Sequence, residues 1–245
     1  MGERYFSKYD LKGAYHWAEY HGGLRSMNAY TKARYDMILS LLHEAPPGRV
    51  ADIGCGDGVL AGLLSRDRDV VGIDTNAKAI DLAREAFAMR GLKGTFLTAE
   101  GYHSPLPDGS IAVAVSSDVI EHVAKPESLL LDMYRILQLG GWAILTTPIK
   151  VSDTPFDPLH VQEWFTPDFV ELCAKVFGSP LKVIRSHPLF WYEVLVSPNP
   201  WLRRFGRLGI NAMTRLGRNP FLEQTGRWRI YTTQCVVMQK APSAP

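Results

Sequence analysis

The sequence predicts an α/β protein built on a doubly wound, mostly parallel sheet of seven strands, with an antiparallel last strand and helices on both faces. Short apolar runs alternate with helix-like patterns along most of the chain, which is typical of βαβ units. The first apolar run leads into the glycine-rich turn "GCGDG". The chain has 245 residues, of which 46% are hydrophobic and 21% charged, so disordered, collagen-like and coiled-coil proteins are excluded.

Residues 1–45 are predicted to be helical and to precede the first strand. Apolar residues recur there at helical spacing: Met37, Ile38, Leu41 and Leu42. The pattern stops at "EAPPGR", because two consecutive prolines do not continue a helix.

Residues 46–187 are predicted to form the core of alternating strands and helices. We expect strands at 49–54, 69–74, 94–99, 111–117, 141–147 and 181–186. The intervening helices are expected at 59–65 and 77–90, from Pro126 onward, and from the Thr166–Pro167 pair onward. Gly91 follows the second of them as a C-cap. Residues 229–240 supply the final strand of the core.

A basic insertion, residues 188–228, separates the last two strands and is expected to be a long irregular connection that contains one helix. Residues 199–230 hold seven arginines and one glutamate, a net charge of +6, whereas the rest of the chain carries −4. Arginines at steps of three and four, with Asn211 among them, flank an apolar stripe that includes Trp201 and Phe205, which predicts an amphipathic helix over 201–218. Such a helix suits an anionic membrane surface, and packing on its own domain or on a dimer partner is the alternative.

Acidic residues and glycines at the ends of the first three strands predict a nucleoside-binding site. The glycines at 54, 56 and 58 allow a ligand to approach the backbone closely, but Val59 replaces the third glycine of a dinucleotide fingerprint. Asp52 favours a ligand with an ammonium or sulfonium group rather than a pyrophosphate. Asp74 is placed to accept from ribose hydroxyls, and Glu100 from an adenine amino group.

Four segments, "VADIGCGDGVL", "VVGIDTN", "AEGYHSPLPDGSIAVAVSSDVIEHV" and "LQLGGWAILTTP", resemble those of the class I S-adenosylmethionine-dependent methyltransferases. The resemblance covers about residues 48–185 and implies a Rossmann-like fold with S-adenosyl-L-methionine as cofactor and S-adenosyl-L-homocysteine as product. It implies that the methionine part is held by Asp52, Gly54, Cys55 and Gly56, and the ribose by Asp74 and Thr75. It implies that the adenine is held by Glu100 and Gly101, with Ser117 nearby. The aromatic residues before the first strand would then form a lid, with Tyr15 and Trp17 as candidates and an ordinary packed helix as the alternative.

Three residues are candidates for catalysis, because methyl transfer to a hydroxyl needs a group that removes its proton. Glu121 and His122 follow the fourth strand, and His160 lies in the loop after the fifth, with Trp164 and Phe165 as candidate walls of the acceptor site. Each histidine has a purely structural alternative, in which it bonds loop backbone or caps a turn.

The order of Asp118, Glu121, His122 and His160 is also similar to the metal-binding set of the RNA 3′-terminal 2′-O-methyltransferases. Their oxygen and imidazole ligands suit magnesium or manganese. Aspartate replaces the first glutamate of that set, and the later motif is incomplete, so a metal is not part of our leading prediction.

We therefore expect a methyltransferase that acts on an oxygen of a small-molecule, glycan or lipid-linked acceptor by in-line transfer. A metal-dependent RNA ribose methyltransferase and a non-catalytic cofactor-binding subunit are the alternatives, and nucleic acid is not the expected partner. Three widely spaced cysteines and an amino terminus without an apolar run predict a cytoplasmic protein, with peripheral contact to the inner membrane face through 201–218.

Overall fold

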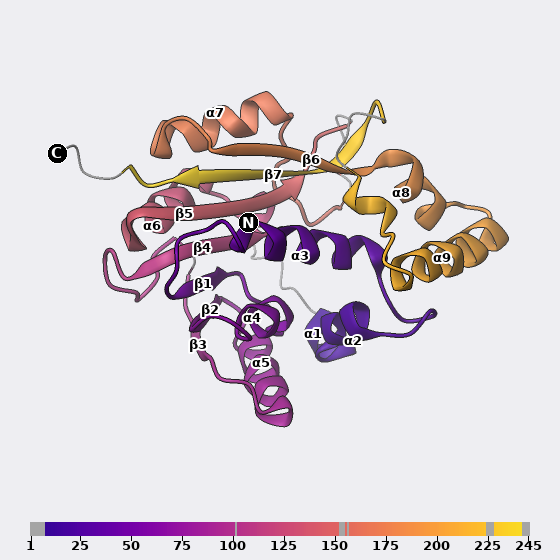
Figure 1. The fold of residues 1–245 in the computed structure, drawn as a ribbon, viewed down its shortest axis with the longest axis horizontal. Helices are drawn as coiled ribbons and strands as arrows, with labels where there is room; N and C mark the ends of the chain where they lie inside the picture. The colour runs from indigo at the N-terminus through magenta and orange to yellow at the C-terminus, as the bar shows by residue number, and fades with distance from the viewer. Residues whose placement is uncertain (1–7, 101, 152–154, 156, 224–227, 242–245) are drawn as a thin grey trace.

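The computed structural model describes residues 8–100, 102–151, 155, 157–223 and 228–241. One seven-stranded sheet with the order β3-β2-β1-β4-β5-β7-β6 runs through the molecule (Figure 1). Its strands are β1 (Val50–Ile53), β2 (Val70–Asp74), β3 (Thr95–Thr98), β4 (Ile111–Ser117), β5 (Leu137–Pro148), β6 (Lys182–Pro188) and β7 (Tyr231–Gln239). β7 is antiparallel to both of its neighbours, which confirms the predicted mostly parallel sheet.

Helices cover both faces of this sheet because successive strand residues point to opposite sides. On one face, Val50, Val70 and Val113 pack against α3 (Ala29–Leu42), α4 (Val59–Leu64) and α5 (Ala77–Arg90). On the other face, Ala51 and Val71 pack against α6 (Pro126–Ile136) and α7 (Thr166–Phe177). Every residue of β1 is buried, as expected for a central parallel strand.

The amino-terminal segment is helical as predicted. Three helices precede β1: α1 (Lys8–Lys12), α2 (Tyr15–His21) and α3. Asn28 caps α3 by accepting from the backbone N–H groups of Tyr30 and Thr31. At the other end of a core helix, Gly91 follows α5 in the left-handed conformation, with φ of 62°, as its sequence position predicted.

The insertion between β6 and β7 is more regular than predicted. It contains α8 (Leu189–Val196), α9 (Pro200–Arg215) and the short 3-10 helix η2 (Pro220–Leu222). Together with α3 they enclose a small second core around Phe221, Leu195 and Ile210. The sequence missed α8 because its residues are apolar on all sides and show no helical periodicity. Among the described residues, no helix has both the length and the apolar character that crossing a membrane requires.

Candidate functional site

The glycine-rich loop between β1 and α4 has a backbone that only glycine adopts readily. Gly54, Gly56 and Gly58 have φ of 76°, 53° and 78°. The amides of Gly54 and Cys55 donate to the carbonyl of Ile73, at 2.7 and 3.0 Å, which ties the loop to the end of β2. The loop therefore lies at the carboxyl ends of the central strands, where α/β folds bind ligands.

The Asp74 carboxylate closes this loop from the end of β2. Its two oxygens accept from the backbone N–H groups of Gly56 and Asn76, both at 2.8 Å. Burial raises the pKa of Asp74, and these two hydrogen bonds oppose that effect. A carboxylate has about four lone-pair sites, so the group remains able to accept from a ligand hydroxyl.

Asp52 is the most unusual charge of the site. Its side chain is buried within β1, and its Oδ2 atom has no hydrogen-bond partner. Burial, and secondarily the charge of Asp74, raises the pKa of Asp52 to about 7. A buried carboxylate oxygen without a partner is unfavourable unless a cation neutralises it.

The other predicted cofactor residues differ in how exposed they are. Cys55 is buried with its sulfur close to Gly72, so only its backbone is available to a ligand. Thr75 and Glu100 are exposed at the ends of β2 and β3. Ser117, at the end of β4, is half-buried and accepts a hydrogen bond from the Thr146 hydroxyl at 3.3 Å. Gly101 lies outside the described residues.

The amino-terminal helices sit on the glycine-rich loop, and Tyr9 of α1 lies against Gly56. A Cβ atom at Gly56 would lie 2.3 Å from the Tyr9 hydroxyl. The loop residue Asp57 accepts from the His16 amide at 2.9 Å and, through its carbonyl, from the Trp17 indole at 2.8 Å. Of the predicted lid residues, Trp17 is thus buried as an anchor, while Tyr15 packs beside Tyr9 at 5.9 Å between ring centroids.

A cavity of about 210 Å³ opens at the ends of β4 and β5, and Val119, which follows its lining residue Asp118, lies against Gly54 of the loop. The cavity is lined by Tyr30, Asp118, Pro148, Asp157, His160, Tyr192 and Thr232. Asp118 has φ of 52° and forms an ion pair with Arg34 of α3. Trp164 and Phe165 do not belong to this lining, contrary to expectation: Trp164 packs on Phe169, and Phe165 is half exposed.

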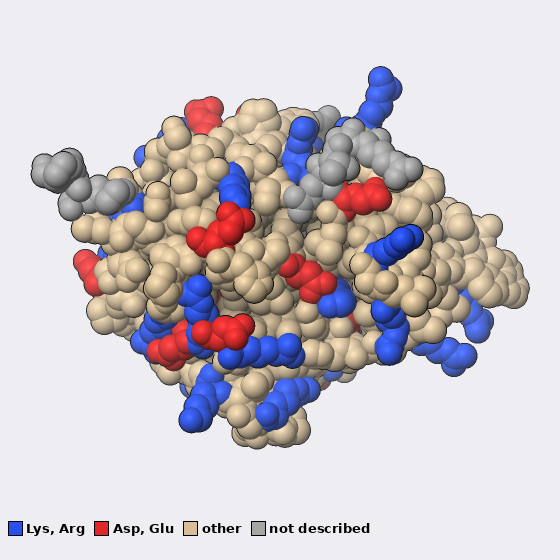
Figure 2. Space-filling view, viewed as in Figure 1, with Lys and Arg blue, Asp and Glu red and all other residues tan. Residues whose placement is uncertain are grey.

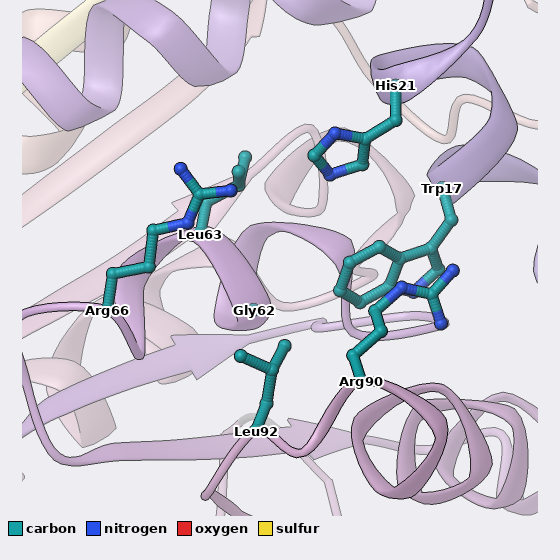
Figure 3. A pocket seen from close by; sticks show the side chains of 7 residues that line it. All are labelled: Trp17, His21, Gly62, Leu63, Arg66, Arg90 and Leu92. Carbon is teal, nitrogen blue, oxygen red and sulfur yellow. The ribbon is translucent and has the colours of Figure 1, made fainter.

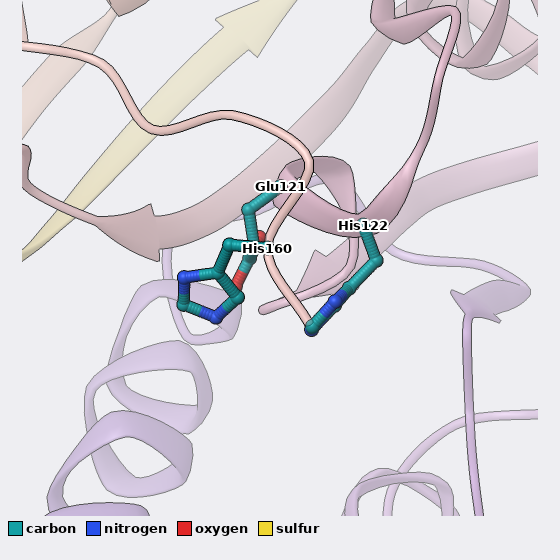
Figure 4. A group of neighbouring side chains, drawn as sticks. All are labelled: Glu121, His122 and His160. Atoms are coloured by element: carbon teal, nitrogen blue, oxygen red, sulfur yellow. The ribbon is translucent and has the colours of Figure 1, made fainter. Parts of the chain in front are cut away.

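The predicted catalytic residues are brought together at the edge of the same cavity. Glu121 and His122 lie in the 3-10 turn η1 (Ile120–His122) after β4, and His160 approaches them from the loop after β5 (Figure 4). The imidazoles of His122 and His160 are 4.9 Å apart between ring centroids. Burial lowers the pKa of His122, which favours its neutral form. The Asp118 carboxylate forms an ion pair with Arg34 and accepts from the Thr146 hydroxyl.

A larger cavity, of about 350 Å³, lies elsewhere, between α2, α4 and α5 (Figure 3). Trp17, His21, Arg66 and Arg90 surround it, and the Arg90 guanidinium lies 3.9 Å from the centre of the Trp17 ring. Neither cavity is lined by the glycine-rich loop or by Asp74. The smaller cavity is lined by Asp118 and His160, and Val119, which follows Asp118, lies against Gly54 of the loop. We therefore assign the chemistry to the smaller cavity.

Sequence comparison identifies a known domain in the first part of the sheet. Residues 51–145 match the family model of a methyltransferase domain. A Mycolicibacterium smegmatis protein named "Probable S-adenosylmethionine-dependent methyltransferase" is 29% identical over 157 residues, which are 61% of this chain and 59% of that protein. A Mycobacterium bovis protein named "Uncharacterized methyltransferase" is 35% identical over 126 residues, or 50% of this chain and 48% of that protein. The chain thus spans about half the length of the curated relatives it matches.

Solved structures share the fold beyond the matched domain. One is geranyl diphosphate C-methyltransferase from Streptomyces coelicolor, solved with Mg²⁺, geranyl diphosphate and S-adenosyl-L-homocysteine. Its TM-score is 0.62 at 13% identity, and the alignment covers 85% of this chain and 79% of that protein's chain. The cyclase SpnF also has a TM-score of 0.62, at 15% identity, and the alignment covers 86% of this chain and 82% of the SpnF chain. Because this fold is found in a protein named as a cyclase, the fold alone does not assign the reaction.

Several residues of the site were missed by the sequence analysis. Asp57 lies inside the glycine motif, and its position there was the available signal. Tyr30 and Arg34 belong to a helix whose apolar spacing indicated only packing. Tyr192 lies on the unpredicted helix α8. These three residues reach the cavity or its Asp118 wall only through the tertiary arrangement, so no local pattern marks them.

Proposed function

Because this chain belongs to the class I S-adenosylmethionine-dependent methyltransferase superfamily, we propose that it methylates a hydroxyl oxygen of a small-molecule, glycan or lipid-linked acceptor. The observation that supports this reaction is the position of His160. Its imidazole lines the cavity at the ends of β4 and β5, and its Nδ1 is 2.5 Å from the Glu163 carboxylate. An imidazole oriented by a carboxylate is a common arrangement for removing a hydroxyl proton.

The described residues fit the cofactor. The unpartnered, buried Oδ2 of Asp52 is complementary to a ligand cation, and Gly56 leaves its side of the loop free of side chain. The residues that would hold the cofactor are those predicted from the sequence: Asp52, Gly54, Cys55, Gly56, Asp74, Thr75, Ser117, Glu100 and Gly101. When bound, S-adenosyl-L-methionine supplies a methyl group on a positively charged sulfur. The Tyr9 hydroxyl lies against the same face of the loop, so α1 has to shift as the cofactor enters.

The chain's own residues would then orient the acceptor and remove its proton. The acceptor hydroxyl would lie in the cavity between Tyr30, Asp118 and His160. Since the displacement is in-line, holding the oxygen close to the methyl carbon supplies most of the rate. The hydroxyl proton would leave through the cluster of Glu121, His122 and His160. The aromatic lid of α1 and α2 would exclude water from the transfer.

Binding and methyl-transfer measurements test this function. We expect saturable binding of both S-adenosyl-L-methionine and S-adenosyl-L-homocysteine in titration calorimetry, weakened at least tenfold in Asp74→Asn. Labelled methyl groups should be transferred to hydroxyl acceptors in a cell extract, at a rate lowered at least a hundredfold in His160→Ala with cofactor affinity retained. Asp81→Asn, an exposed change on α5, is the matched control for charge. If neither cofactor form binds, the proposal is wrong.

The surface of α9 supports a peripheral contact with anionic lipid. The side chains of Trp201, Leu202 and Phe205 are 68%, 51% and 59% exposed, although they form the apolar stripe of the helix. In Figure 2 the end of the molecule over α8 and α9 is mostly tan, with basic side chains projecting beneath it. Exposed aromatic rings next to arginines match the interface of an anionic bilayer. Tyr192 of the adjoining α8 lines the acceptor cavity, so a lipid-linked acceptor would reach it from this side.

Vesicle co-sedimentation tests this contact. We expect the chain to bind phosphatidylglycerol vesicles and not phosphatidylcholine vesicles, with binding lost in a Trp201→Ser, Phe205→Ser double variant and reduced at high salt. Lys175→Ser, an exposed cation on α7, is the control and should bind as the wild type does. An equal soluble fraction with both vesicle types would contradict the contact.

A further inference from the structure

Three side chains at the edge of the acceptor cavity converge as ligands of a metal ion would. One nitrogen each of His122 and His160 and one carboxylate oxygen of Glu121 all lie within 4.8 Å of one another (Figure 4). They come from two segments, η1 and the loop after β5. The backbone joins these segments, because Val161 donates to the Glu121 carbonyl at 2.8 Å. The cluster is therefore held together independently of any bound ion.

Both imidazoles are oriented by a hydrogen bond at Nδ1. His122 Nδ1 is 3.1 Å from the Leu159 carbonyl, which only accepts, so this nitrogen carries the proton. His160 Nδ1 is 2.5 Å from Glu163 Oε1. Each ring thus keeps Nε2 as the nitrogen with a free lone pair. Histidines that bind metals are typically held in this way, by a carbonyl or a carboxylate on the other ring nitrogen.

The Glu121 carboxylate provides the second, independent observation. Its side chain is fully buried. Oε2 accepts from the Thr147 hydroxyl at 3.1 Å, whereas Oε1 has no hydrogen-bond partner. A buried carboxylate oxygen next to two imidazole nitrogens, with no hydrogen-bond donor assigned to it, is stabilised by a bound cation.

We propose that Glu121, His122 and His160 bind one divalent transition-metal ion, with Glu163 as a positioning residue for His160. Two imidazoles and one carboxylate match the three protein ligands of catalytic zinc sites, which keep a fourth position open. The set also accommodates Mn²⁺, whereas Mg²⁺ prefers oxygen ligands alone. Asp118 is not a ligand, because its carboxylate is already paired with Arg34.

This site deepens the proposed function and rests on it for its role: with the ion bound, His160 holds the metal through Nε2 instead of taking the acceptor proton itself. The open position would face the cavity that His160 lines, so the acceptor oxygen would bind the ion and its pKa would fall. The hydroxyl proton then leaves to water, the oxygen–carbon bond forms, and the carbon–sulfur bond breaks. Methyl transfer changes no oxidation state, so the reaction needs no oxidant or reductant.

The test measures metal binding on the full chain without reference to activity. After removal of metal with EDTA and gel filtration, Zn²⁺ is titrated by calorimetry, and the metal retained after dialysis is counted by mass spectrometry. We expect one Zn²⁺ per chain. The affinity should fall at least a hundredfold in His160→Ala and in Glu121→Gln, which keeps the shape of the side chain. Glu163→Gln should lose ten- to a hundredfold, as expected for a carboxylate that orients a ligand.

Controls separate this proposal from folding defects and from the proposed function. His43→Ala removes an exposed histidine after α3 and should bind Zn²⁺ within twofold of wild type. Far-ultraviolet circular dichroism checks that each variant is folded. If Zn²⁺ does not bind, or binds equally to Glu121→Gln, His160→Ala and His43→Ala, the site is refuted. Titration of the metal-free chain with S-adenosyl-L-methionine tests the cofactor site separately, so either proposal can fail alone.

Discussion

Replacing Asp52 by asparagine tests whether a buried charge is kept in β1 for a cationic ligand. Burial raises the pKa of Asp52 from the ordinary 3.8 to about 7. Between these values the unfolded chain has lost the proton that the folded chain keeps, so stability falls as pH rises from about 4 to about 7. Each tenfold change in proton affinity corresponds to 1.36 kcal/mol, so the penalty above pH 7 is about 4 kcal/mol.

Asparagine preserves the shape of the side chain and removes the charge. We therefore expect Asp52→Asn to raise the free energy of unfolding at pH 8 by about 2–4 kcal/mol, and by far less at pH 5. The lower bound reflects the buried amide, which has its own hydrogen-bonding requirements. Urea unfolding followed by tryptophan fluorescence at both pH values measures the difference, and Asp81→Asn on exposed α5 is the control.

The second measurement on the Asp52→Asn variant is its affinity for the cofactor. If Asp52 faces the ligand's sulfonium, Asp52→Asn should weaken S-adenosyl-L-methionine more than S-adenosyl-L-homocysteine. If it faces the ammonium group, both should weaken equally. A variant that binds both ligands as the wild type does, with no gain in stability at pH 8, would refute the reasoning.

Three further predictions concern Gly56, His187 and the ion pair of Arg34 with Asp118. Gly56→Ala should weaken cofactor binding at least tenfold in calorimetry, because φ is 53°, which strains an alanine, and the new Cβ would lie on the face of the loop that the cofactor approaches; wild-type affinity would contradict this. Burial lowers the pKa of His187 to about 3, so the stability it contributes is present above pH 6.5 and lost as pH falls toward 3. His187→Asn should therefore flatten the acid limb of urea unfolding, and an unchanged limb would contradict the assignment. Arg34→Met leaves Asp118 unpaired and should lower the free energy of unfolding by about 3 kcal/mol, with part restored by a second Asp118→Asn change; equal stability of wild type and single variant would exclude this role for the pair.

The sheet could be predicted because its signals are local. Each strand is a short apolar run bounded by glycine or by charged residues, and the end of α5 was marked by Gly91 alone. The convergence of His160 with Glu121 was expected only because both follow adjacent parallel strands. The orientation of Asn211 was not predictable: it falls on the arginine stripe of α9 but is buried, because it binds another segment of the chain. The burial of such residues depends on contacts between segments that are far apart in the sequence. The residue pattern of a single helix does not show these contacts.

The contact made by Asn211 ties the insertion to the rest of the molecule. Its amide nitrogen donates to the carbonyls of Leu24 and Met27, both at 2.8 Å, in the connection between α2 and α3. Phe221 of η2 packs in the same small core as Ala29 of α3. A shortened protein from which residues 189–222 were excised would therefore leave two carbonyls and part of α3 uncovered. Any attempt to transplant these helices onto a related scaffold must bring a matching acceptor turn with them.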